Sequence, residues 1–266
     1  MAFEAGGRGA ADTPRPPVVP RRSASLLLVR DDPLRVLMLR RGSTRGAFPS
    51  ALVFPGGVLE PEDSVVAAAH GYDATDEFAA LRAAAIRETW EEVGVLLARD
   101  PSDRFLTRPQ VPTPLAAGAG GLGGVLGAAA ARLALDEVVP FGRWITPVEG
   151  KRRFDTDFFL ARAPEEQEPT ADGVEAVALR WVEPAEVPAL TNEMLLLPTL
   201  MNLRRLGSFG SVSEAIEAAP SLPRVPVTST VGFDGAGNPV VRIPAEAGYG
   251  ITEFYPKDLG HFQFER

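Results

Sequence analysis

The sequence has 266 residues, a formal net charge of −8 and no cysteine. The lack of thiols excludes disulfides and thiolate zinc sites, and the acidic balance argues against a general nucleic-acid-binding surface. Because the sequence has neither an 18-residue apolar run nor an apolar stretch behind a basic start, we expect a cytoplasmic protein without membrane partners.

The first third of the chain predicts a tail followed by part of a sheet. Residues 1–21 are rich in Gly, Ala and Pro and show no apolar period, so we expect a disordered tail. Short apolar runs at 23–29, 36–41 and 51–54 predict strands. The third run leads into Pro55-Gly56-Gly57, where paired glycines allow a ligand or a metal to approach the backbone closely.

The centre of the chain predicts a long amphipathic helix. Thr75 or Asp76 is suited to cap its start, and Gly94 is a typical C-terminal glycine. One side of this helix is apolar and is expected to face the core. It carries Ala79, Ala83, Ile86, Trp90 and Val93.

The other side of this helix is acidic. Glu88, Glu91 and Glu92 fall within about a 100° arc, and Arg87 lies one turn before Glu91, with which we expect it to pair. Like charges crowded on one turn are unfavourable unless a cation compensates them, and hard divalent ions such as Mg²⁺ prefer oxygen ligands. Taken alone, the pattern also fits an ordinary solvated helix face.

The remainder of the chain alternates loops and regular elements. Residues 109–127 are rich in Gly, Pro and Ala and are expected to form a mobile loop, either a plain linker or a substrate lid. From residue 220 onward we expect an irregular tail with a hairpin around Asp234-Gly235. The elements predicted between them are strands at 142–147, 153–161 and 174–182 and helices at 128–137, 184–190, 192–206 and 213–219.

Two stretches together resemble the Nudix box, G-x5-E-x7-R-E-U-x-E-E-x-G-U, in which U is a bulky apolar residue. They are Phe54–Asp63 and Arg87–Val95, with matches at Arg87, Glu88, Glu91, Glu92, Gly94 and Val95. Asp63 stands where the box has its first acid, and an insertion at 64–79 separates it from Arg87, which puts the role of Asp63 in doubt. Thr89 also takes a position that is usually bulky and apolar.

The resemblance implies an α/β fold, the Nudix-type α/β/α sandwich with a mixed β-sheet, over residues 22–206. Residues 207–266 are then an unassigned C-terminal extension, and the oligomeric state stays open. The implied activity is hydrolysis of a diphosphate bond in a small-molecule nucleoside diphosphate derivative, with Mg²⁺ or Mn²⁺. The insertion and the segment from Trp144 to Phe159 resemble a coenzyme A diphosphatase branch of the family. ADP-ribose or a nucleotide sugar as substrate, and a non-catalytic Nudix-like regulator, are the alternatives.

The same resemblance implies roles for particular residues. Glu88, Glu91, Glu92 and the Gly56 carbonyl would hold the metals, and Arg87 would keep Glu91 in place. The attacking water would be oriented or deprotonated by Glu88 or by an acid from another loop.

Candidates outside the box are less sharply defined. The additional acid is expected at Glu175, with Asp172, Glu137 and Glu149 competing for this role. Arginines could bind the substrate phosphates, because guanidinium groups match phosphate geometry, or they could be ordinary solvated side chains. These arginines are Arg40, Arg41, Arg152 and Arg153.

Overall fold

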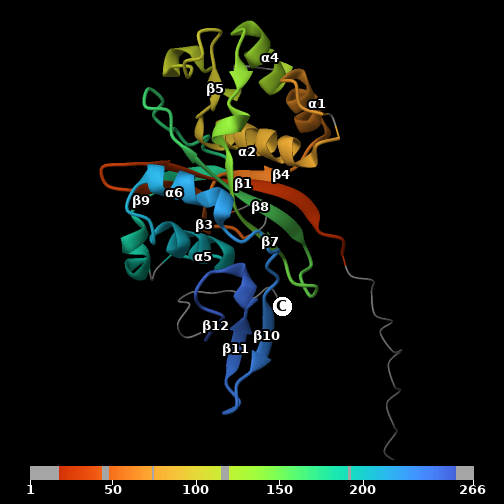
Figure 1. The fold of residues 1–266 in the computed structure, drawn as a ribbon, viewed down its shortest axis with the longest axis vertical. Helices are drawn as coiled ribbons and strands as arrows, with labels where there is room; N and C mark the ends of the chain where they lie inside the picture. The colour runs from red at the N-terminus through yellow and green to blue at the C-terminus, as the bar shows by residue number, and fades with distance from the viewer. Residues whose placement is uncertain (1–17, 44–47, 74, 115–119, 191–192, 256–266) are drawn as a thin grey trace, which may run out of the picture.

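The computed structural model describes residues 18–43, 48–73, 75–114, 120–190 and 193–255. Its centre is a mixed β-sheet with the strand order β3-β2-β1-β8-β7, in which β4 also pairs with β1 and β9 pairs with β2 (Figure 1). Strand β1 runs parallel to β8 over nine residue pairs, from Arg21↔Phe154 to Val29↔Arg162, and the other pairings in this sheet are antiparallel. The strands are β1 (Arg21–Arg30), β2 (Arg35–Arg41), β3 (Leu52–Val53), β4 (Gly56–Val58), β7 (Val139–Ile145), β8 (Phe154–Arg162) and β9 (Ala176–Val182).

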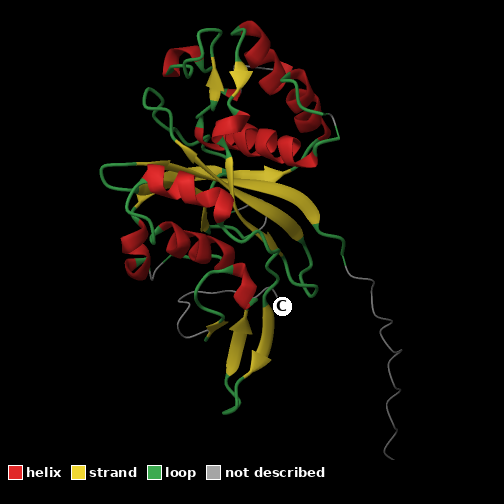
Figure 2. Cartoon of the chain, viewed as in Figure 1, coloured by secondary structure: helices red, strands yellow, loops and turns green. Residues whose placement is uncertain are grey.

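Helices cover both faces of this sheet (Figure 2). Helices α1 (Pro61–Ala69) and α2 (Glu77–Val93) lie on one face, and α5 (Leu197–Leu206) and α6 (Val212–Ala218) lie on the other. Strand β1 explains the two layers, because its fully buried run alternates between them: Leu26 and Leu28 belong to the cluster under α2, whereas Leu27 and Val29 belong to the cluster under α5. The expected α/β/α sandwich is confirmed.

Short elements beyond α2 form a cap at the top of Figure 1. They are β5 (Ala98–Arg99), η1 (Arg108–Gln110), α4 (Gly121–Ala128), β6 (Arg132–Leu133) and η3 (Leu135–Glu137). The helix predicted at 128–137 is wrong, since α4 ends at Ala128 and the chain then continues into β6. Part of the predicted loop 109–127 is helical instead, because Leu122, Val125 and Leu126 recur at helical spacing and are buried in the core. Residues 115–119 of this loop lie outside the described residues.

The insertion at 64–79 forms most of α1 and the first residues of α2. After β9 the chain forms the 3₁₀ helix η4 (Pro184–Ala189) before α5. The predicted tail 1–21 is described only from Val18, and β1 already begins at Arg21. In the described part of the chain, no helix is long and apolar enough to cross a membrane.

The C-terminal extension forms a second, small sheet below the main one in Figure 1. Strands β10 (Thr230–Phe233) and β11 (Pro239–Arg242) form the hairpin predicted around Asp234-Gly235, and β12 (Glu253–Phe254) pairs with β11. Two 3₁₀ helices, η5 (Ala219–Ser221) and η6 (Ala245–Ala247), connect these elements. The extension is joined to the edge of the main sheet at Val227, whose N–H donates to the Arg143 carbonyl at 2.9 Å and whose carbonyl accepts from Ile145 at 2.8 Å.

Candidate active site

Helix α2 begins and ends where its sequence predicts. The carboxylate of Asp76 accepts hydrogen bonds from the backbone N–H groups of Phe78 and Ala79, at 2.9 and 3.1 Å, and so caps the first turn. Gly94 ends the helix in the left-handed conformation, with φ of 70°. The predicted apolar stripe is buried, and Trp90 is only 1% exposed. This packing sets the rotation of the helix and directs its acidic side toward β4, where Gly56 contacts Glu92.

Arg87 joins α2 to two other elements. Its guanidinium donates to both oxygens of Asp63 in α1, at 2.8 and 3.0 Å, and to the Val58 carbonyl in β4, at 3.0 Å. It also donates to Glu88 at 2.8 Å and to Glu91 at 3.0 Å, so the predicted pair with Glu91 is confirmed. Asp63 is 1% exposed and accepts from the Glu60 N–H in the capping box of α1. The insertion therefore follows Asp63 without removing it from the site.

Glu92 is buried and Glu88 is partly buried, with 14% of its side chain exposed, beside the glycine pair. Gly56 N–H donates to Glu92 Oε2 at 2.9 Å, and the Glu88 carboxylate lies so close over Gly57 that a Cβ there would overlap it. Burial raises the pKa of Glu92 to about 8. The hydrogen bond from Gly56 lowers this pKa, and the nearby charge of Glu88 raises it further. Burial also raises the pKa of Glu88 to about 7, partly offset by Arg87. Burial raises the pKa of the more exposed Glu91 as well.

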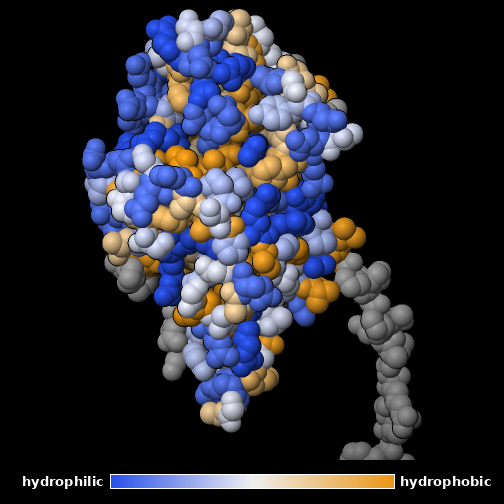
Figure 3. Space-filling view, viewed as in Figure 1, coloured by the Kyte–Doolittle hydropathy of each residue, from blue (hydrophilic) through white to orange (hydrophobic). Residues whose placement is uncertain are grey.

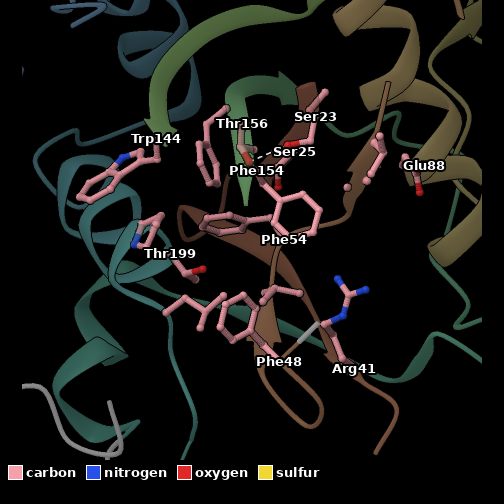
Figure 4. Close-up of a pocket in the computed structure, with 18 of the residues that line it drawn as sticks. Ser23, Ser25, Arg41, Phe48, Phe54, Glu88, Trp144, Phe154, Thr156 and Thr199 are labelled. Carbon is pink, nitrogen blue, oxygen red and sulfur yellow. Dashed lines mark hydrogen bonds between the residues drawn. The ribbon is translucent and has the colours of Figure 1, made fainter. Parts of the chain in front are cut away.

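These acids lie at one end of a cleft of about 2040 Å³. Figure 4 shows Glu88 on one side and Trp144 on the opposite side, with the rings of Phe48, Phe54 and Phe154 between them. The remainder of the wall comes from the start of α5, including Thr199, and from the extension, including Thr228, Ser229, Val231 and Pro239. The arrangement thus places a carboxylate-rich floor next to a long, largely apolar chamber.

Comparisons with known proteins show which proteins this chain is similar to. No protein-family model matches the sequence. The chain is 32% identical to a Caenorhabditis elegans protein named "Putative nudix hydrolase 7", over 62% of this chain and 52% of that protein. It is 28% identical to a crystal structure of a NUDIX hydrolase from Alicyclobacillus acidocaldarius, with a TM-score of 0.66, over 75% of this chain and 96% of that one. The chain therefore resembles Nudix hydrolases in both sequence and fold.

A further Nudix relative is named for its substrate. The chain is 27% identical to the acyl-coenzyme A diphosphatase NUDT19 of Gallus gallus, over 90% of this chain and 80% of that protein. The chain spans about half the length of the Caenorhabditis elegans relative, and 62% of the human NUDT19 protein, to which it is 30% identical.

The arginines that were expected to bind phosphates divide into two groups. Arg41, Arg152 and Arg153 line the cleft. Arg153 is held by bonds from its side chain to the carbonyls of Thr146 and Val18. Arg40 does not line the cleft; its guanidinium donates instead to Glu193 at 2.7 Å.

Of the four acids considered outside the Nudix box, three line the cleft and one does not. Glu175 lines the cleft, and its charge contributes to the raised pKa values of Glu88 and Glu92, after their burial. Asp172 lines the cleft too and accepts from the backbone N–H groups of residues 174–176, which shapes this loop. Glu149 lies in the cleft wall, whereas Glu137 is paired with Arg99 in the cap.

Several cleft residues were not among those predicted from the sequence. Arg108 lines the cleft and donates to the Gly94 carbonyl at the end of α2, at 2.9 Å, but it lies in a stretch without a motif. Thr228 and Ser229 come from the extension, whose composition gave no signal. Trp144 carried part of the family resemblance, but no role was assigned to it.

The donor set of this site fits a hard divalent cation in its chemistry. Glu88, Glu91 and Glu92 supply only oxygen ligands, and Arg87, which also contacts Asp63, is the cation that contacts Glu88 and Glu91. Burial raises the pKa values of all three glutamates, which a bound cation would counteract. In the described residues, no group of three or more acidic, His or Cys side chains converges as a ready metal centre, because these carboxylates are engaged with Arg87 and Gly56. The backbone N–H of Gly56 faces Glu92, and the predicted role of the Gly56 carbonyl stays a prediction.

Proposed function

We propose that the chain catalyses metal-dependent hydrolysis of the diphosphate bond in a nucleoside diphosphate linked to a second group, with coenzyme A or an acyl-coenzyme A as the best candidate. The observation that carries this proposal is the position of the buried Glu92 and the partly buried Glu88 at the floor of a cleft that is otherwise largely apolar. Burying a carboxylate without a compensating cation destabilises a protein. Carboxylates with raised pKa values in a cleft are therefore typical of sites that bind a cation or transfer a proton.

In this proposal the acids of α2 bind the metal, and one of them also activates the attacking water. Glu88, Glu91 and Glu92 would bind Mg²⁺ or Mn²⁺, which would neutralise the charge that gathers on the diphosphate oxygens during attack by water. Glu88 would also orient the attacking water or accept its proton. Glu175 is the second candidate for this base. The bridging P–O bond then breaks, and Arg87 keeps Glu88 and Glu91 in position throughout.

Substrate phosphates are assigned to the arginines of the cleft. Arg41 lies near the acidic floor, where its charge lowers the pKa of Glu92, so it is placed to bind the diphosphate. Arg152 and Arg153 lie in the turn between β7 and β8, farther along the cleft, and are candidates for an additional phosphate group. A phosphate outside the diphosphate, as in coenzyme A, distinguishes this substrate from ADP-ribose.

Coenzyme A is preferred for two reasons. The avian relative that the chain matches over 80% of its length is named an acyl-coenzyme A diphosphatase. Pockets for small ligands usually measure about 300–1,000 Å³. The cleft is larger, at about 2040 Å³, and therefore offers room for a long substituent beyond a nucleoside diphosphate.

The test is a substrate panel with the purified protein and Mg²⁺. Coenzyme A, octanoyl-coenzyme A, ADP-ribose and a nucleotide sugar are incubated separately, and the products are identified by mass spectrometry. We expect the coenzyme A compounds to give a 3′,5′-bisphosphorylated nucleoside and a phosphopantetheine. Faster cleavage of ADP-ribose or of the nucleotide sugar would contradict coenzyme A as the substrate but would still support diphosphate hydrolysis. No cleavage of any compound would favour the non-catalytic regulator.

A further inference from the structure

The far end of the cleft opens onto an apolar rim. In the described part of the chain, eight large hydrophobic side chains are exposed, and three of them, Val148, Val174 and Val231, line the cleft. Val148 and Val231, at 50% and 60% exposure, lie at this opening, whereas Val174 adjoins Glu175. Pro239 lines it as well, and Phe233, at 71% exposure, is its cross-strand partner in the hairpin. We use the term apolar rim for Val148, Val231, Phe233 and Pro239.

The hairpin geometry places these side chains on one surface. Val231 and Phe233 are two residues apart on β10 and therefore point to the same face of the hairpin. Pro239 lies directly opposite Phe233, so its side chain is on that face too. Val231 and Pro239 of this face line the cleft, as does Thr230 of the other face, so the hairpin borders the cleft and Phe233 adjoins the lining residue Pro239. Figure 3 shows hydrophobic side chains over this lower part of the molecule, among polar ones.

The rim belongs to the cleft rather than to a separate interaction surface. It is continuous with the apolar wall that includes Trp144, which Figure 4 places opposite Glu88. A stable protein interface usually buries about 800 Å² on each partner, contributed by some 20–30 residues. Four side chains are too few for such an interface, whereas they suffice for a flexible hydrocarbon chain.

We propose that the apolar rim binds the acyl chain of a fatty-acyl thioester of coenzyme A while its diphosphate lies at Glu88. This inference rests on the proposed function and names residues for a part of the substrate that the acidic helix does not contact. The C-terminal extension would then determine specificity, because three of the four rim residues belong to it. Bound this way, the chain would cover side chains that are otherwise exposed to water.

Binding separates this inference from the proposed chemistry. Calorimetric titrations in EDTA, where no metal supports turnover, compare octanoyl-coenzyme A with coenzyme A on the wild-type protein. We expect the octanoyl ester to bind about tenfold more tightly, which corresponds to partial burial of the chain. Equal affinity of the two ligands, or no binding of either, would overturn the inference.

The matched variants are Val231→Ser with Phe233→Ser, and Val65→Ser as the control. All three side chains are exposed, at 60%, 71% and 68%, so the substitutions should leave the fold intact, as circular dichroism would check. The double variant should lose most of the tenfold preference, while Val65→Ser on α1 keeps it. A double variant that retains the full preference would contradict binding of the acyl chain at the apolar rim. If the preference follows the rim but Mg²⁺ brings no hydrolysis, the proposed function fails and the acyl site stands.

Discussion

Arg87 and Asp63 form a two-pronged ion pair, with bonds of 2.8 and 3.0 Å, although they are 24 positions apart in the chain. Both side chains are nearly inaccessible, at 7% and 1% exposure. The pair holds α1 against α2. The remaining guanidinium nitrogen of Arg87, Nη1, donates hydrogen bonds to Glu88 and Glu91. The position of the acidic floor thus depends on a residue outside the helix that carries it.

Removing the charge of Asp63 should destabilise the protein. Asp63→Asn leaves Arg87 buried without its main partner, and breaking a buried pair in this way costs about 3–5 kcal/mol. We expect a lower melting temperature. We also expect a lower kcat, because Arg87 would no longer be held by Asp63 and would position Glu88 and Glu91 less firmly. The control is Glu62→Gln, an exposed acid on the same turn. Equal melting temperatures for the two variants would contradict this role.

Neutralising Glu92 should affect activity far more than stability. Glu92→Gln removes a proposed metal ligand and should reduce turnover by about 10²-fold or more. The metal-free fold should change little or gain slightly, since the substitution relieves repulsion with Glu88. Trp90→Ala removes a buried ring and its bond to the Pro112 carbonyl and should cost about 3–5 kcal/mol. Thermal melting and turnover of both variants give the comparison; normal turnover of Glu92→Gln would make the carboxylate structural.

A methyl group at Gly57 should disturb catalysis from the strand side. Its Cβ would overlap the Glu88 carboxylate, which must then move. We expect Gly57→Ala to lower kcat by about tenfold, on the scale of a misplaced catalytic group. Gly124→Ala in α4 is the matched control, because nothing lies within 4 Å of a Cβ there. That variant should keep full activity, and steady-state kinetics of the two proteins decide the point.

The metal-free protein should lose stability as pH rises. The native pKa values of Glu88 and Glu92, about 7 and about 8, lie above the ordinary value of 4.5. Between those limits the native state holds more protons than the unfolded state, so the free energy of unfolding falls as pH increases from about 4.5 to about 8. Melting temperatures in EDTA at several pH values measure this decline. Glu92→Gln should flatten it, and added Mg²⁺ should oppose it; a metal-free melting temperature that rises over this window would exclude the effect.

The hydroxyl of Tyr249 should help to fix the far wall of the cleft. It accepts from Trp144 Nε1 at 2.9 Å and lies 3.1 Å from Asn202 Oδ1, and the ring stacks on the buried guanidinium of Arg205. Tyr249→Phe leaves these polar groups without their partner and should cost about 1–3 kcal/mol. We expect KM to rise more than kcat falls, because Trp144 lies away from the acids. A change in kcat alone would assign the tyrosine another role.

The core and the acidic helix were predictable because their signals are local. Asp76, Gly94 and the spacing of Trp90 with Val93 define α2 without reference to the remainder of the chain. The buried run of β1 is similarly clear. Such patterns specify what a segment becomes, and for these segments the tertiary structure agrees with them.

The parts that were missed depend on contacts distant in sequence. Helix α4 contains several glycines, and its formation follows from the burial of Leu122 and Leu126 against the core rather than from propensity. The position of Asp63 follows from the packing of α1, and that of Arg40 from a pair with Glu193, 153 positions away. No local pattern in the extension indicates that Thr228 and Ser229 border the cleft.

The parallel pairing of β1 with β8 has a consequence for biosynthesis. The first strand of the sheet is complete at Arg30, but its partner begins only at Phe154, so paired residues such as Arg22 and Asp155 are 133 positions apart. At typical elongation rates of about 5–20 residues per second, the ribosome needs on the order of ten seconds to supply that partner. Throughout this interval the leucines of β1 have one hydrogen-bonding edge open. The nascent chain is therefore most exposed to misassociation before β8 emerges, and chaperone binding should concentrate on its first strand.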